Sequence, residues 1–235
     1  MSRRRPVVAI DGPAGAGKTS VTRAVARELG YLLVDTGAIY RSVALAAQRI
    51  GVAWGDSDGV GALAENLARE EAIRFVVTDA GQRVLLRGDD VSTAIRTQDI
   101  AEGASQVSAI PRVRAALLDM QRRSGVEGGV VLEGRDIGSV VFPDAEAKFF
   151  LTASVEVRAL RRHAELVARG EPADLEVIRR EVRERDRRDS TREVAPLVQT
   201  EDALLVDSSE LGIDEVVARI VGRVREVERR LLSAP

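Results

Sequence analysis

A glycine-rich segment near the N-terminus constrains this chain more than any other feature. Residues 12–19 read GPAGAGKT and match the pattern G-x-x-x-x-G-K-[ST] at every fixed position. A short apolar run, residues 6–10, precedes the segment, and apolar residues at helical spacing follow it from Lys18 to Leu29. A loop between a strand and a helix can wrap phosphates with its backbone N–H groups, and the helix N-terminus adds positive partial charge. The pattern therefore predicts a nucleoside triphosphate site in an α/β fold.

Lysine is scarce in this chain, and one of its two lysines lies in that loop. The basic residues number 35, of which only Lys18 and Lys148 are not Arg. From the chain's own composition, on the order of 0.001 chance matches to the pattern are expected. We expect the compact charge of Lys18 to bridge the outer phosphates of ATP, and the Thr19 hydroxyl to bind Mg²⁺. The residues predicted to bind ATP in this segment are Gly12, Pro13, Ala14, Gly15, Ala16, Gly17, Lys18, Thr19 and Ser20.

Composition excludes several other classes of function. The chain has no Cys and a single His, His163, which rules out thiol nucleophiles, disulfide frameworks, zinc fingers and HExxH hydrolases. The net charge of −2 disfavours a general nucleic-acid binder. No run of 18 apolar residues exists, so we expect no membrane span. The apolar stretch after the basic N-terminus ends at Asp11, too early for a signal peptide, and we expect a cytoplasmic protein.

The order of the predicted elements is typical of a parallel sheet with helices on both faces. Buried strands are predicted at residues 6–10, 31–34, 130–133, 147–151 and 204–206. Helices are predicted at residues 18–29, 39–50, 111–124, 154–170 and 174–189, with a last one capped by Asp214. Glycines and aspartates between residues 55 and 61 predict a loop. Residues 73–77 and 83–87, around a turn signal at 79–81, predict an antiparallel hairpin inserted into the α/β chain.

The loop predicts nucleotide binding and leaves three classes of reaction open: a small-substrate kinase, a GTPase switch, and an ATP-driven motor. A guanine-reading Asn/Thr-Lys-x-Asp motif is impossible, because Phe149 and Phe150 follow the only lysine outside the loop, Lys148. The chain has neither a strand ending in consecutive acids nor a sensor motif, which disfavours a motor. Its size favours a kinase with a lid.

An acceptor site is predicted where two strands end. Glu133, Arg135 and Asp136 follow residues 130–132, at the carboxyl edge where open α/β sheets bind ligands. Glu133 could order a magnesium-bound water, Arg135 could grip a phosphate, and Asp136 could accept from an exocyclic amine. The second strand is followed in the same way by a hydroxyl, an aromatic ring and an arginine: Thr36, Tyr40 and Arg41. From the residues alone, two purely structural interpretations remain open. The charges could merely end a strand, and Thr36 could simply cap a helix.

These motifs together resemble the bacterial cytidylate kinases, almost from end to end. The likeness is carried by residues 10–13, 35–41, 95–97, 104–107, 111–114, 134–138, 141–145 and 185–189. The resemblance implies transfer of the ATP γ-phosphate to CMP or dCMP, giving CDP or dCDP and ADP, with Mg²⁺. It also implies the α/β fold of P-loop nucleoside monophosphate kinases: a five-stranded parallel sheet flanked by helices, with an inserted antiparallel hairpin subdomain and a helical lid.

The resemblance also implies a division of the chain. The core would comprise residues 1–36, 125–153 and 193–235. The acceptor-binding domain would comprise residues 37–124, with the insert at about 55–105, and the lid with the following arginine-rich helix would comprise residues 154–192. We expect a monomer whose partners are ATP and CMP or dCMP, with neither nucleic acid nor membrane.

The family's functional residues carry over motif by motif. The CMP phosphate would be held by Thr36, Arg41 and Arg135, with Tyr40 beside them. The cytosine edge would be read by Ser105, Arg114, Asp136 and Arg192, and the sugar hydroxyls by Arg185 and Asp189. The lid arginines over the ATP phosphates would be Arg158, Arg161 and Arg162. The catalytic residues would be Lys18, Arg135, Arg158 and Arg161, and the metal would be bound by Thr19 and Glu133.

Two departures from the family pattern and two alternatives remain. Glu133 stands where some relatives have Asp, and the loop ends Lys-Thr-Ser where some have Lys-Gly-Thr. The resemblance assigns no role to Arg96. A broader UMP/CMP kinase and a non-catalytic nucleotide-binding module are the alternative functions. The attacking phosphate oxygen of CMP is already anionic near neutral pH, so the reaction asks for no general base, in keeping with a chain that has one His and no Cys.

Overall fold

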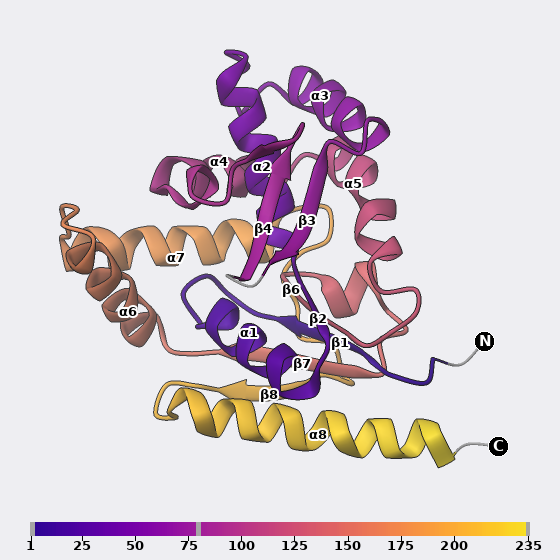
Figure 1. The fold of residues 1–235 in the computed structure, drawn as a ribbon. Coiled ribbons are helices and arrows are strands. Elements are labelled where there is room, and N and C mark those ends of the chain that lie inside the picture. The colour runs from indigo at the N-terminus through magenta and orange to yellow at the C-terminus, as the bar shows by residue number, and fades with distance from the viewer. Residues whose placement is uncertain (1–2, 79–80, 234–235) are drawn as a thin grey trace. The chain divides into compact units, whose positions relative to one another are not determined.

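The computed structural model describes residues 3–78 and 81–233, which form two units (Figure 1). The first unit comprises Met1–Leu33 and Gly125–Pro235, and the second comprises Val34–Ser124. The chain passes from one unit to the other within β2 (Leu32–Asp35). Each unit has its own hydrophobic core.

A five-stranded parallel sheet is the centre of the first unit. Its order is β2-β6-β1-β7-β8, with β1 at Val7–Asp11, β6 at Val130–Gly134, β7 at Ala147–Thr152 and β8 at Leu204–Asp207. Every residue of β1 is buried, as a central strand covered on both faces requires. In the register of β1 and β6, Asp11 pairs with Gly134. The glycine-rich loop and the Arg135–Asp136 segment therefore leave the sheet side by side.

Helices complete the first unit. The sheet shares one apolar cluster with α1 (Lys18–Leu29) and α8 (Ile213–Ser233), which contribute Val25 and Ile220 among others. A single π-helical turn, η2 (Ile137–Val141), follows β6. The two charged helices α6 (Val155–Ala168) and α7 (Leu175–Thr191) pack together around a separate small apolar cluster. This sheet with flanking helices confirms the predicted parallel α/β architecture.

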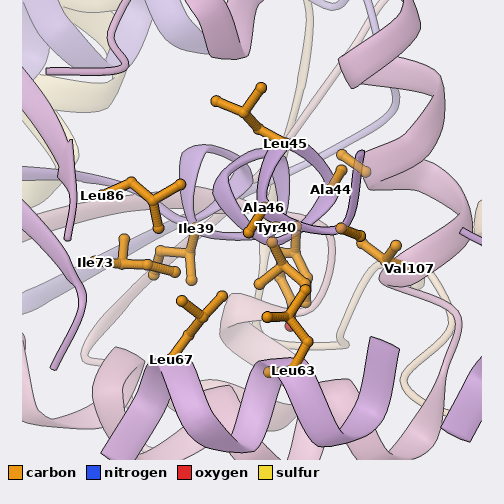
Figure 2. Packing of buried hydrophobic residues seen from close by; sticks show 14 of the residues in the cluster. Ile39, Tyr40, Ala44, Leu45, Ala46, Leu63, Leu67, Ile73, Leu86 and Val107 are labelled. Carbon is orange, nitrogen blue, oxygen red and sulfur yellow. The ribbon is translucent and has the colours of Figure 1, made fainter. Parts of the chain in front are cut away.

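The second unit packs four helices and a small antiparallel sheet around one core. The helices are α2 (Thr36–Arg49), α3 (Ser57–Arg69), α4 (Gln98–Val107) and α5 (Pro111–Arg123), and a 3₁₀ turn, η1, spans Ala94–Arg96. The sheet has the order β3-β4-β5, with β3 at Ile73–Thr78, β4 at Gly81–Leu86 and β5 at Asp89–Asp90. Figure 2 shows Ile39 and Tyr40 of α2 among Leu63, Leu67 and other side chains of this core. The predicted inserted hairpin is confirmed by the antiparallel pairing of β3 and β4. Of the turn expected at 79–81, residues 79 and 80 lie outside the described residues.

The expectation of a loop at residues 55–61 is wrong, because α3 begins at Ser57. The side chain of Asp56 caps this helix by accepting from the backbone N–H of Gly59 at 3.0 Å. Gly61 lies inside the helix because Arg112 of α5 packs against it: a Cβ at this position would be 2.5 Å from Arg112 Cδ. Here glycine permits a close approach of two helices rather than a turn.

Two helix starts and one whole helix also differ from the expectation. Helix α2 begins at Thr36 rather than residue 39, and its cap is Asp35, which accepts from Ala38 N at 3.0 Å, rather than Thr36. Helix α8 begins before Asp214, which lies in its first turn and is not its cap. Helix α4 falls within the predicted insert and was not expected.

Candidate active site

The glycine-rich loop has a backbone that only glycine adopts readily. Gly12, Gly15 and Gly17 have φ of 151°, 76° and 86°. A Cβ on Gly12 would lie 1.9 Å from the carbonyl oxygen of Leu151 on β7. The first glycine is therefore needed for close packing against the sheet, and the last one leads directly into α1. The loop predicted from the sequence is found in its expected place; Ser20, after it, is exposed.

Lys18 is folded back against the loop. Its ammonium group donates to the carbonyl oxygens of Gly12 and Pro13, both at 2.6 Å, and its side chain is buried. Burial lowers the pKa of Lys18 well below its usual value, and the positive charge of Arg135 lowers it further. A desolvated cation next to loop carbonyls is a strong site for anionic oxygens that can replace them.

Thr19 and Glu133 meet beside the loop. The Thr19 hydroxyl donates to Glu133 Oε2 at 3.1 Å, and the Glu133 side chain is buried. In the described part of the chain, no group of three or more His, Cys, Asp or Glu residues could hold a metal ion by itself. Mg²⁺ prefers oxygen ligands and is usually bound by one or two carboxylates together with substrate phosphates. The hydroxyl and carboxylate fit a Mg²⁺ ion that arrives with a triphosphate.

Arg135 and Asp136 are each paired with a residue at the end of α7. Arg135 Nε donates to Asp189 Oδ2 at 2.7 Å, and Arg192 donates to Asp136 Oδ1 at 3.3 Å. Burial alone would raise the pKa of Asp189, but the positive charges of Arg135 and Arg185 outweigh it and hold the pKa below its usual value. Five residues predicted to bind CMP are thus gathered within the first unit.

The predicted lid arginines reach the glycine-rich loop in two of three cases. The guanidinium of Arg158 donates to the Ala14 carbonyl oxygen at 3.1 Å, and the side chain is only 4% exposed. Arg161 donates to the Ala16 carbonyl oxygen at 3.5 Å and to the backbone oxygen of Ser208 at 2.7 Å. Arg162 instead pairs with Glu165 of its own helix.

The remaining predicted residues lie in the second unit. Arg41 of α2 forms an ion pair with Asp35, the N-cap residue of the same helix, at 2.6 Å. Arg114 of α5 lies over the ring of Tyr40, with its guanidinium carbon 5.5 Å from the ring centroid. Ser105 of α4 is buried, and its hydroxyl has no hydrogen-bond partner among the residues that the structure describes. A buried hydroxyl of this kind is costly unless a ligand satisfies it. Thr36 begins α2 and is buried.

Comparison with known proteins decides the family. The family model described as cytidylate kinase matches residues 8–226. The chain belongs to the cytidylate kinase family. A cytidylate kinase from Geobacter sp. (strain M21) is 53% identical over 220 residues, covering 94% of this chain and 93% of the relative. One from Pseudomonas aeruginosa (strain UCBPP-PA14) is 48% identical over 227 residues, covering 96% of each chain.

A more distant likeness exists among solved structures. A gluconokinase from Sinorhizobium meliloti 1021 is 16% identical with a TM-score of 0.49, over 98% of this chain and 97% of that one.

Among the helices that the structure describes, in residues 3–78 and 81–233, none has the length and hydropathy needed to span a membrane. The family resemblance inferred from the motifs is confirmed.

Three polar residues of this cytidylate kinase family member were not expected at the site. Asp186 of α7 binds both terminal nitrogens of Arg158, at 2.8 and 2.6 Å. The Ser208 hydroxyl accepts from Arg161 at 3.1 Å. Asp11 ends β1 and accepts from two backbone N–H groups beyond Asp136. The charged run 185–189 and an aspartate directly after a buried strand were the available signals, but their partners are distant in sequence.

Proposed function

We propose that this chain transfers the γ-phosphoryl group of ATP to CMP or dCMP, giving ADP and CDP or dCDP. One observation carries the proposal. In a member of the cytidylate kinase family, β1 and β6 end side by side, one in a triphosphate-type loop and the other in Arg135 and Asp136. A donor site and an acceptor site at one sheet edge are what a nucleoside monophosphate kinase needs.

On the donor side, we propose that the loop from Gly12 to Ser20 wraps the ATP phosphates. Lys18 would exchange its two bonds to loop carbonyls for bonds to phosphate oxygens. Arg158 and Arg161 would neutralise the charge of the transferring group, and Arg162 would join them. Mg²⁺, held through Thr19 and Glu133, supplies further charge neutralisation when it is bound with ATP. Positioning and electrostatics of this kind supply most of the catalysis in phosphoryl transfer.

On the acceptor side, the proposal assigns a role to each gathered group. In the first unit, Arg135 would hold the CMP phosphate, Asp136 and Arg192 would read cytosine, and Arg185 and Asp189 would meet the sugar. The buried Arg135–Asp189 ion pair supports this, because it fixes the guanidinium of Arg135 before the substrate arrives.

In the second unit, we propose that Thr36 and Arg41 hold the phosphate, with Tyr40 beside them. Ser105 and Arg114 would read the cytosine edge. The buried Ser105 hydroxyl supports a polar ligand group at this position, because its oxygen has no hydrogen-bond partner within residues 3–78 and 81–233. The stacking of Arg114 on Tyr40 supports a preformed arginine.

We propose in addition a lid formed by residues 154–192, a core formed by residues 1–36, 125–153 and 193–235, and an acceptor-binding domain at residues 37–124. The separate apolar cluster shared by α6 and α7 supports a lid that moves as one body. The proposed enzyme is monomeric and cytoplasmic, with small nucleotides as its partners.

The test is ADP release measured with CMP, dCMP, UMP, AMP and no acceptor. We expect CMP and dCMP to support turnover well above UMP and AMP. Equal rates with CMP and UMP would instead favour the broader pyrimidine monophosphate kinase. ATP binding without acceptor-dependent ADP release would make the chain a non-catalytic binding module. In the same assay, Asp136→Ala should reduce the preference for CMP over UMP, whereas Asp174→Ala, at the far end of α7, should leave that preference unchanged.

A further inference from the structure

Asp11 occupies the junction between the two halves of the proposed site. It is the last residue of β1, its backbone leads directly into Gly12, and it pairs with Gly134 across the sheet. Its side chain is 6% exposed. A carboxylate is retained at such a buried place only where hydrogen bonds compensate for the lost water.

The bonds that compensate for this burial come from the acceptor segment. Asp11 Oδ1 accepts from the backbone N–H of Ile137 at 2.8 Å, and Oδ2 accepts from that of Gly138 at 2.8 Å. Both groups follow Asp136 directly in the chain. The backbone of Gly138 lies close to two side chains, since a Cβ there would be 3.1 Å from Lys148 Cδ, a tight contact, and 3.5 Å from Asp11 Oδ2. Two hydrogen bonds to the carboxylate therefore hold the backbone immediately after the two residues proposed to bind CMP.

The other end of the same turn is held by Asp136 itself. Its carbonyl oxygen accepts from Val140 N at 2.9 Å and from Val141 N at 3.1 Å, which closes the π-helical turn. With Asp11 on one side and this turn on the other, the backbone at Asp136 has little freedom. The charged groups that act on Asp11 are Asp136, Lys18 and Arg135. These are groups of the proposed site.

We propose that Asp11 is a positioning residue, which sets the geometry of Arg135 and Asp136 for the acceptor through the backbone of Ile137 and Gly138. This inference rests on the proposed function. Asp11 itself touches neither substrate. Its removal should therefore affect the acceptor nucleotide and spare the affinity for ATP, although it stands next to the glycine-rich loop.

The experiment compares Asp11→Asn, Asp11→Ala and wild type in steady-state kinetics with each substrate varied in turn. The amide of Asn keeps one acceptor oxygen and the same size, and Ala keeps neither acceptor. We expect KM for CMP to rise about threefold in Asp11→Asn and about tenfold in Asp11→Ala, the latter equal to about 1.4 kcal/mol. KM for ATP should stay within about twofold of wild type in both variants. The urea midpoint of Asp11→Asn should be no lower than that of wild type.

Glu215→Gln is the control. Glu215 Oε2 also accepts from a backbone N–H group, that of Gly212 at 2.8 Å, but it lies in the first turn of α8, a helix that carries none of the proposed site residues. Its substitution should change neither KM. If Asp11→Asn leaves KM for CMP unchanged, or raises both KM values equally, Asp11 is not a positioning residue for the acceptor. If wild type shows no CMP-dependent ADP release, it is the proposed function that fails, so the two failures are distinguishable.

Discussion

Replacing Asp189 by Asn should destabilise the fold far more than breaking an equally short ion pair on the surface. Asp189 and Arg135 meet at 2.7 Å, and their side chains are only 7% and 19% exposed. The substitution keeps the size of the side chain and removes its charge. Arg135 is then left buried near Arg185 and Arg192, which both act on the same carboxylate in the native protein.

The magnitude follows from this burial. Two unit charges about 4 Å apart attract by about 4 kcal/mol at the effective dielectric constant of a protein, against about 1 kcal/mol in water. Removing one partner of a buried pair typically costs about 3 kcal/mol or more, because the other charge stays desolvated. The pKa of Asp189 is held below its usual value of 3.8, so the pair stabilises the fold above that pH. Its contribution is lost as the pH falls through the lowered pKa.

The assay is urea unfolding at pH 7, followed by circular dichroism without nucleotide. With a slope of about 3 kcal/mol per molar urea, we expect the midpoint to fall by about 1 M in Asp189→Asn. The double variant Arg135→Met with Asp189→Leu should recover much of this loss, since the buried guanidinium of Arg135 is removed together with its partner. Glu65→Gln is the matched control: it breaks the pair with Arg112, also at 2.7 Å, whose members are 42% and 45% exposed, and no resolvable shift is expected. A midpoint for Asp189→Asn equal to that of wild type would refute the reasoning.

Three further outcomes are expected. Lys18→Ala should lower kcat by at least about 100-fold with an unchanged circular dichroism spectrum, and near-normal turnover would contradict the role of Lys18. Gly12→Ala should lower the thermal midpoint far more than Gly170→Ala, because its Cβ would lie 1.9 Å from Leu151 O while Gly170 faces open space; equal losses would contradict this packing. Burial raises the pKa of Asp11 to about 6 from 3.8, so the folded state holds the proton more tightly. Wild type should lose up to about 3 kcal/mol of stability relative to Asp11→Asn as the pH rises from about 4 to 7, and a difference independent of pH would show that this shift is absent.

The strands and helices of the first unit were predictable because apolar residues form continuous runs in the strands and recur at helical spacing in the helices. A five-residue apolar run gives β1, and Val21 and Val25 at helical spacing give the buried face of α1. The glycine-rich loop was recognisable from sequence because its pattern fixes the residue type at both of its ends. Local patterns of this kind are sufficient wherever a strand or helix is stabilised mainly by its own face.

Helices α3 and α4 were not predictable in the same way, because each contains glycine, which is unfavourable inside a helix. Gly61 and Gly103 lower intrinsic helix propensity, but each allows a large neighbour to approach. A Cβ on Gly103 would lie 2.4 Å from the ring of Trp54, which is distant in sequence. Tertiary packing thus outweighs propensity at these two positions, and a single sequence gives no sign of the neighbour.

The residues of the candidate site also fall into two groups, those that a sequence motif predicts and those that only the folded structure reveals. Lys18, Thr19, Arg135 and the predicted lid arginines could be proposed from motifs, since the proposed chemistry asks for a particular residue type. Asp11, Asp186 and Ser208 act on other protein groups, and those partners become visible only when the chain is folded.

The most direct test of the proposed reaction is to follow the phosphoryl group itself. Wild type would be incubated with Mg²⁺, CMP and ATP labelled with ³²P at the γ position, and the nucleotides would then be separated. We expect the label to move to CDP in step with ADP formation, with little release as inorganic phosphate. Label that stays on ATP, or that is released to water while CMP remains unmodified, would contradict the assignment of this chain as a nucleoside monophosphate kinase.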